Sequence, residues 1–127
     1  MKKFWLLVTG ILLVAYLVAG CAGEVKTYTD AGQAISINSN QEFAIALDSN
    51  PTTGYSWQES HDEAMLKLVK KTYEQGEQAK KGLVGAGGID YFRFQALKAG
   101  ETKITLIYKR PWETDSIDLK VFTVTIR

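Results

Sequence analysis

Residues 91–96 have the sequence YFRFQA, and the apolar side chains Phe92, Phe94 and Ala96 occupy every second position. A period of two places one set of side chains on one face of a β-strand. Only residues 61–66 allow a short helical turn instead. The same alternation recurs on both sides of this stretch, at residues 33–38, 42–48, 54–58, 66–73, 102–110 and 117–127.

About seven short strands within roughly 100 residues predict an all-β fold, an immunoglobulin-like antiparallel β-sandwich. A chain of 127 residues has room for one such domain with a single core. In the last predicted strand the apolar side chains change parity between Val121 and Phe122. This change predicts a β-bulge that turns the apolar face of the strand.

The composition excludes several classes of function. With 15 Lys and Arg residues against 14 Asp and Glu residues, a net charge of +1 offers no basic surface for nucleic acid. One Cys and one His are too few for the usual zinc sites, and a single Cys forms no disulfide within the chain. His61 is interpreted as part of a solvated polar turn. We therefore expect no metal, no cofactor, no nucleic-acid partner and no enzymatic activity.

The N-terminal 20 residues have the pattern of an export signal. Lys2 and Lys3 are followed by an uncharged and largely apolar run, residues 4–19. The run ends in Leu17-Val18-Ala19-Gly20-Cys21, which resembles the lipobox of bacterial lipoproteins. The resemblance implies that residues 1–20 are removed and that Cys21 carries acyl chains such as palmitate. Two or three chains would hold the protein on a membrane, outside the cytoplasm.

Two alternatives stay open for this segment. One is an uncleaved transmembrane helix, because about 17 apolar residues is the lower limit for crossing a bilayer. The other is a buried structural thiol at Cys21. A small and polar stretch follows the cysteine, which favours a lipidated N-terminus and tether at 21–32 before a folded domain at 33–127. Removal of the two N-terminal lysines leaves 13 basic residues against 14 acidic ones, a net charge of −1.

Three loops between the predicted strands are candidates for function, because a rigid sandwich presents binding residues on the loops at its ends. Taken alone, the first loop, residues 50–55, has the chemistry of a plain turn. The second loop, residues 85–88, ends a long stretch without apolar periodicity, 74–88, and lacks the lysine of a phosphate-binding loop. The third places Trp112 in a polar turn, so we expect an exposed aromatic residue of the kind found in binding hot spots. The loops are Asn50-Pro51-Thr52-Thr53-Gly54-Tyr55, Gly85-Ala86-Gly87-Gly88 and Arg110-Pro111-Trp112.

In this order and at these spacings, the three loops resemble the signature motifs of the chagasin family of cysteine-peptidase inhibitors. The resemblance covers residues 33–127 and implies an immunoglobulin-like fold with all three loops at one end. It also implies reversible, tight and competitive inhibition of papain-like peptidases, such as papain and the cathepsins, by loops that occlude the active-site cleft. We expect the inhibitor to be a monomer. The alternative is a non-inhibitory envelope lipoprotein that serves adhesion or assembly.

The same resemblance implies a role for each loop. Residues 50–55 form a central wedge, with Thr52 and Thr53 nearest the catalytic cysteine and histidine of the peptidase. Residues 85–88 lie along the non-primed side of the cleft, where glycines allow close backbone pairing. On the primed side, Trp112 stacks on an aromatic residue and Arg110 pairs with an acid or with backbone carbonyls.

Overall fold

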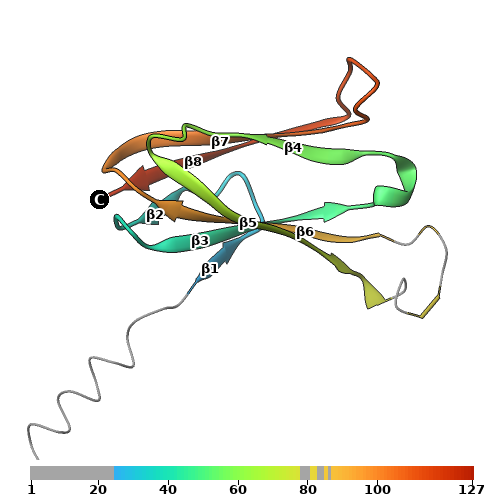
Figure 1. The fold of residues 1–127 in the computed structure, drawn as a ribbon, viewed down its shortest axis with the longest axis horizontal. Coiled ribbons are helices and arrows are strands. Elements are labelled where there is room, and N and C mark those ends of the chain that lie inside the picture. Colours follow the sequence, from blue (N-terminus) through green and yellow to red (C-terminus); the bar gives the residue numbers. More distant parts are fainter. Residues whose placement is uncertain (1–24, 78–80, 83–84, 86) are drawn as a thin grey trace, which may run out of the picture.

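Two four-stranded β-sheets face each other across the apolar core of the computed structural model, which describes residues 25–77, 81–82, 85 and 87–127 (Figure 1). One sheet has the strand order β1-β3-β6-β5 and the other β2-β8-β7-β4. No helix in the described ranges is long and apolar enough to cross a bilayer. The elements are β1 (Lys26–Tyr28), β2 (Ile35–Ile37), β3 (Glu42–Ser49), the 3₁₀ turn η1 (Pro51–Thr53), β4 (Ser56–Ser60), β5 (Leu66–Gln75), β6 (Gly88–Ala96), β7 (Gly100–Lys109) and β8 (Asp118–Ile126).

The predicted β-sandwich is confirmed, and the alternating residues build its core. Strands β3, β6, β7 and β8 each turn alternate apolar side chains towards the facing sheet, whereas β5 buries only Leu66. Burial of each large side chain contributes about 1.5–3 kcal/mol. The core includes Ile35, Ile37, Phe43, Ile45, Leu47, Trp57, Leu66, Phe92, Phe94, Ala96, Ile104, Leu106, Phe122, Val124 and Ile126.

The start of the folded domain differs from the sequence prediction. β1 lies inside the predicted tether 21–32 and pairs in parallel with β3, Lys26 opposite Phe43. The ring of Tyr28 is buried and meets Phe43 edge to face at 6.3 Å. The tether prediction is therefore wrong over 26–28, because an aromatic side chain in a polar stretch completes the core. The predicted signal segment 1–20 and Cys21 lie outside the described residues.

The predicted bulge in the last strand is also wrong. β7 and β8 pair without a shift, from Gly100 opposite Ile126 to Tyr108 opposite Asp118. The parity change instead reflects two faces of one regular strand: Val121 is exposed on the outside and Phe122 is buried inside. A shift of register does occur in β5, between Leu68 and Lys70.

His61 does not lie in a solvated turn as expected. Its Nδ1 atom is 2.7 Å from Oε2 of Glu59, and the two side chains are only 9% and 17% exposed. The imidazole ring also meets Phe94 edge to face at 5.4 Å. A turn does follow, in which the Met65 and Leu66 amides donate to the Asp62 carbonyl. His61 is thus a structural residue packed against the core.

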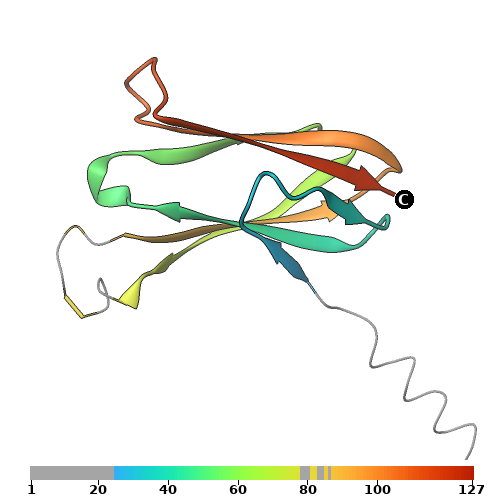
Figure 2. The same ribbon diagram turned by 180° about the vertical axis from the view of Figure 1, so that it is seen from behind.

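The topology brings the candidate loops to one end of the sandwich. Figures 1 and 2 show η1, the adjoining ends of β5 and β6, and the β7–β8 connection at the same end. The C-terminus lies at the opposite end, and β1 begins towards that end as well. The connections that follow β3, β5 and β7 lie at this end because β3 and β5 both run antiparallel to β6, and β7 runs antiparallel to β4 and β8.

Candidate functional site

The wedge loop, residues 50–55, is a rigid turn held by its own hydrogen bonds. The Asn50 side-chain oxygen accepts from the Thr52 amide at 3.3 Å and from the Thr52 hydroxyl at 2.6 Å. The Thr53 hydroxyl donates to the Asn50 carbonyl at 2.7 Å. Pro51 stands at the first position of the 3₁₀ turn, where its fixed φ favours the turn. The sequence itself therefore specifies this loop conformation.

Both threonine hydroxyls are used within the loop, although their side chains are exposed. A hydroxyl has one proton to donate and two lone pairs to accept. Thr52 and Thr53 each give that proton to Asn50, so they present only acceptor lone pairs outward. A partner must supply the donor in any hydrogen bond to them.

Gly54 closes the wedge loop in a backbone conformation that suits glycine. Its φ is +84°, and its amide donates to the Pro51 carbonyl at 3.1 Å. A Cβ at this position would lie 2.7 Å from Cη2 of Trp112. The backbone conformation therefore favours glycine here, and any larger residue would make the Trp112 ring shift.

The glycine loop, residues 85–88, is tied to the root of the wedge loop. Nδ2 of Asn50 donates to the Gly85 carbonyl at 2.7 Å. A Cβ on Gly87 would lie 2.8 Å from the Ser49 carbonyl oxygen, so the glycine lets two backbone segments pack closely. Ala86 lies outside the described residues. β5 extends to Gln75 and β6 begins at Gly88, so the irregular segment is shorter than the predicted 74–88.

The third loop, residues 110–112, is joined to the wedge loop by Arg110. Its Nε donates to the Thr53 carbonyl at 3.0 Å, and its Nη1 lies 3.0 Å from Oε1 of Glu113. The guanidinium carbon lies 4.4 Å from the centre of the Tyr55 ring, which is cation–π distance. Arg110 is therefore engaged with its own chain, and its expected contact with a peptidase stays a prediction.

Among the exposed large hydrophobic residues in the described part of the chain, Trp112 has the greatest exposure. Its side chain is 71% exposed, which confirms the predicted surface aromatic residue. Pro111 beside it is exposed as well. The pair forms an apolar tip beside the wedge loop.

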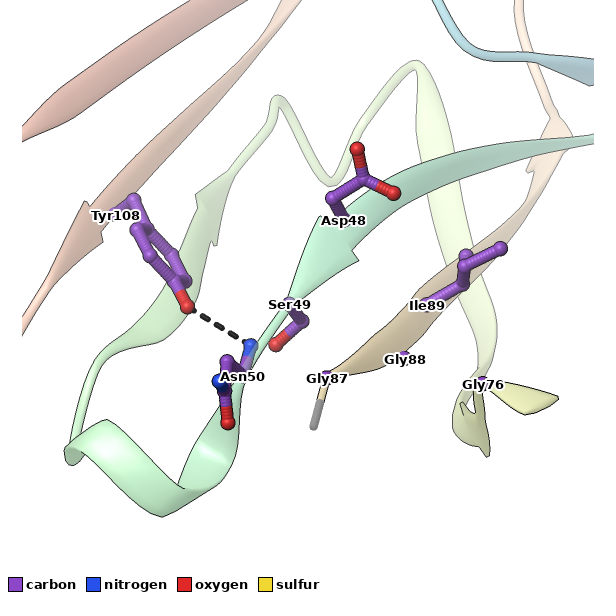
Figure 3. A pocket seen from close by; sticks show the side chains of 8 residues that line it. All are labelled: Asp48, Ser49, Asn50, Gly76, Gly87, Gly88, Ile89 and Tyr108. Carbon is purple, nitrogen blue, oxygen red and sulfur yellow. Dashed lines mark hydrogen bonds between the residues drawn. The ribbon is translucent and has the colours of Figure 1, made fainter. Parts of the chain in front are cut away.

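Two further residues belong to this site that the motifs did not predict, Glu113 and Tyr108. The Tyr108 hydroxyl accepts from the Asn50 amide at 3.0 Å, as Figure 3 shows. The alternation in β7 predicted only that Tyr108 faces inward, and periodicity carries no information about where a hydroxyl ends. Next to it, a hollow of about 550 Å³ lies at the root of the wedge and glycine loops, lined by Asp48, Ser49, Asn50, Gly76, Gly87, Gly88, Ile89 and Tyr108.

The comparison with known families covers all three loops. Residues 36–126 match the family model described as chagasin family peptidase inhibitor I42. The chain belongs to the chagasin family. This confirms the family expected from the three motifs, and it identifies a peptidase inhibitor in place of an enzyme.

Relatives within the chagasin family support the assignment. Chagasin of Trypanosoma cruzi is 32% identical over 102 residues, which cover 76% of this chain and 89% of chagasin. Amoebiasin-1 of Entamoeba histolytica is 34% identical over 92 residues, covering 72% and 86% respectively. Among solved structures, the cysteine protease inhibitor EhICP2 from Entamoeba histolytica superposes with a TM-score of 0.70 at 28% identity, covering 81% of this chain and 96% of EhICP2.

Proposed function

We propose that this chagasin-family protein inhibits papain-like cysteine peptidases reversibly and competitively, with its three loops inserted into the active-site cleft. One observation carries the proposal. All three family motifs lie at one end of the sandwich, and hydrogen bonds from Asn50 to Gly85 and from Arg110 to Thr53 join them. A preassembled surface loses little conformational entropy on binding, which favours affinity.

The wedge loop has the properties needed to fill a peptidase cleft without being cut. A papain-like peptidase attacks a carbonyl carbon with a thiolate that is paired with an imidazolium. In the wedge loop the carbonyl oxygens of Asn50, Pro51 and Thr53 already accept hydrogen bonds from within the protein. The 3₁₀ turn also differs from the extended form in which a peptide pairs with the edge of a cleft. The loop therefore occludes the nucleophile without presenting a peptide bond for attack.

The flanking loops supply the remaining contact area. Gly85 has a φ of +83°, and a Cβ added to it would meet no heavy atom within 4 Å, so its backbone is open to a partner. Trp112 on the other side supplies the large exposed aromatic surface typical of a hot spot. Three contact regions across one cleft suit the roughly 1,600 Å² of a standard protease–inhibitor interface.

A lipid anchor at Cys21 completes the proposal. Its support is the lipobox-like sequence that ends at this cysteine. Lys26, the first residue of β1, follows Cys21 by five positions, so an extended backbone between them spans at most about 18 Å. The acylated cysteine would hold the sandwich close to the membrane surface.

The position of β1 also orients the loops of an anchored protein. Lys26 lies opposite Phe43 near the start of β3, and β3 leads to Asn50 at the root of the wedge loop. Seven residues of strand separate these positions by about 24 Å. The loops would therefore point away from the membrane, towards peptidases in the surrounding space.

A titration tests the inhibitory function. Active papain is mixed with increasing amounts of the full chain in a mild non-ionic detergent, and hydrolysis of a fluorogenic peptide is followed. We expect a stoichiometric loss of rate that dilution into excess substrate reverses. A folded protein, verified by circular dichroism, that leaves papain and several cathepsins active at micromolar concentration would contradict the proposal and favour the envelope-assembly alternative.

A second experiment tests the anchor separately. The chain and its Cys21→Ser variant are produced in a bacterium that processes lipoproteins, and the membrane fraction is examined by mass spectrometry. We expect an acylated N-terminal cysteine in the wild type and a soluble or unprocessed Cys21→Ser variant. An unmodified Cys21 in a full-length chain would exclude the lipoprotein interpretation.

A further inference from the structure

Tyr108 occupies an unusual place between the core and the wedge loop. It is the penultimate residue of β7 and lies opposite Trp57 of β4 in the sheet register. The Trp57 and Tyr108 ring centres are 4.7 Å apart, and Trp57 Nε1 donates to the Asp48 carbonyl at 2.9 Å. The Tyr108 ring is therefore held from behind by a buried indole that is itself hydrogen-bonded to β3.

The same side chain contacts both ends of the wedge loop. At one end, the Tyr108 hydroxyl accepts from the Asn50 amide at 3.0 Å (Figure 3). At the other end, its ring stacks on Tyr55, with centres 5.5 Å apart and planes inclined by 25°. The first and last residues of the loop are thus fixed to a single rigid group that is anchored in the core.

We propose that Tyr108 is a positioning residue that sets the conformation of the wedge loop before a peptidase binds. The inference rests on the proposed function, because it explains how the inhibitory loop is preorganised. Tyr108 acts through Asn50 and Tyr55 and lies at the loop base, beneath the exposed tip at 51–53. The hydroxyl of Tyr108 bonds the Asn50 amide, whereas packing within β7 needs only the aromatic ring, which Phe would also supply.

The expected effect of losing the hydroxyl follows from population arithmetic. The Asn50 amide is part-buried at this bond, so without its acceptor the loop root has to shift towards water to satisfy the amide. If only a fraction of the molecules holds the wedge loop in the conformation that binds the peptidase, the apparent affinity is multiplied by that fraction. One lost hydrogen bond of this kind corresponds to about a tenfold loss of affinity.

The test compares Tyr108→Phe with Tyr28→Phe in the full chain. Tyr28 is a buried tyrosine in β1, a strand that ends on β3 at Ile45, so its variant controls for the loss of a phenol oxygen away from the loops. The readouts are the inhibition constant for papain, the melting temperature and the hydrogen exchange rate of the Asn50 amide. For Tyr108→Phe we expect an inhibition constant about tenfold higher, faster Asn50 exchange and a melting temperature within the change seen for Tyr28→Phe.

Two outcomes would overturn the inference: Tyr108→Phe inhibits as well as the wild type, or its Asn50 amide exchanges at the wild-type rate. A Tyr108→Leu variant, which also removes the Tyr55 stacking, should be weaker than Tyr108→Phe if the ring positions the loop. Equal inhibition by the Tyr108→Leu and Tyr108→Phe variants would contradict the proposal that the Tyr108 ring positions the loop by stacking on Tyr55. Failure of the wild type to inhibit papain would overturn the proposed function instead, while the exchange rate of Asn50 would still report on the loop.

Discussion

Arg110 Nε donates a hydrogen bond of 3.0 Å to the carbonyl oxygen of Thr53, so the third loop holds the tip of the wedge loop. The same guanidinium contacts Glu113 and lies over the Tyr55 ring. An arginine has the planar, multidentate geometry for such a junction, and a lysine does not. The family motif that contains Arg110 therefore also fixes the arrangement of the loops at this end of the sandwich.

Replacement of Arg110 by Ala should weaken inhibition. The Thr53 carbonyl loses its donor and Glu113 loses its partner, and partly exposed charge-assisted bonds of this kind contribute about 1–2 kcal/mol. We expect a roughly tenfold higher inhibition constant, with Arg110→Lys recovering only part of the loss. Arg93→Ala is the matched control, because it also breaks an arginine–glutamate pair. Its partner Glu42 is the first residue of β3, at the end of the strand away from Asn50. Equal effects of the Arg110→Ala and Arg93→Ala changes on inhibition would contradict the account.

Replacement of Trp112 by Ala should separate binding from stability. The side chain is 71% exposed, so the melting temperature should change little, while loss of a hot-spot aromatic costs about 2 kcal/mol or more of binding free energy. The control is Leu119→Ala, which removes an exposed apolar side chain from β8 outside the loops. Calorimetric titration of papain and thermal unfolding measure both quantities. A Trp112→Ala variant that loses stability and affinity together would show a structural residue instead.

Two glycines with similar backbone conformations provide a matched pair. Gly54 and Gly82 have φ values of +84° and +89°, but a Cβ would meet Trp112 only at Gly54 and would meet no heavy atom within 4 Å at Gly82. Both Ala variants should lose about 1 kcal/mol of stability from the left-handed backbone. Only Gly54→Ala should also displace Trp112 and raise the inhibition constant severalfold. Inhibition unaffected by Gly54→Ala would refute the packing argument.

Replacement of His61 by Ala should lower stability and leave inhibition unchanged. Removal of the imidazole leaves Glu59 without its partner and Phe94 without an edge contact, which should cost about 1–3 kcal/mol of stability. His61 follows the end of β4 remote from the wedge loop, so inhibition of papain at a temperature where the variant is folded should be unchanged. A large loss of inhibition by the folded variant would give the only histidine of the chain an unexpected role.

Most of the fold was predictable because a period of two is visible wherever a strand has one buried face. Phe92 and Phe94 illustrate this rule. Val121 and Phe122 show where it fails, since both faces of β8 carry apolar residues and the change of parity resembles a bulge. Tyr28 was missed because it is the only buried residue of β1, and a single buried side chain shows no alternation.

The positions of the site residues were predictable, but several of their partners were not. The motif order placed Asn50, Gly85 and Arg110 in three loops, and the sandwich topology brings these loops together. The links between them depend on side-chain reach across the end of the sandwich, as between Asn50 and Gly85. The hydrogen bond from the Asn50 amide to the Tyr108 hydroxyl is a long-range contact of the same kind. Local sequence carries no signal for such contacts.

The most direct test of cleft occlusion compares papain with an open cleft and papain whose cleft is filled. In the second form, a peptidyl inhibitor linked to the catalytic cysteine occupies the substrate subsites. Isothermal titration calorimetry with the full chain should show stoichiometric binding to open papain and no binding to filled papain at micromolar concentration. Equal affinity for the two forms would place the interface outside the cleft and contradict the proposed role of the three loops.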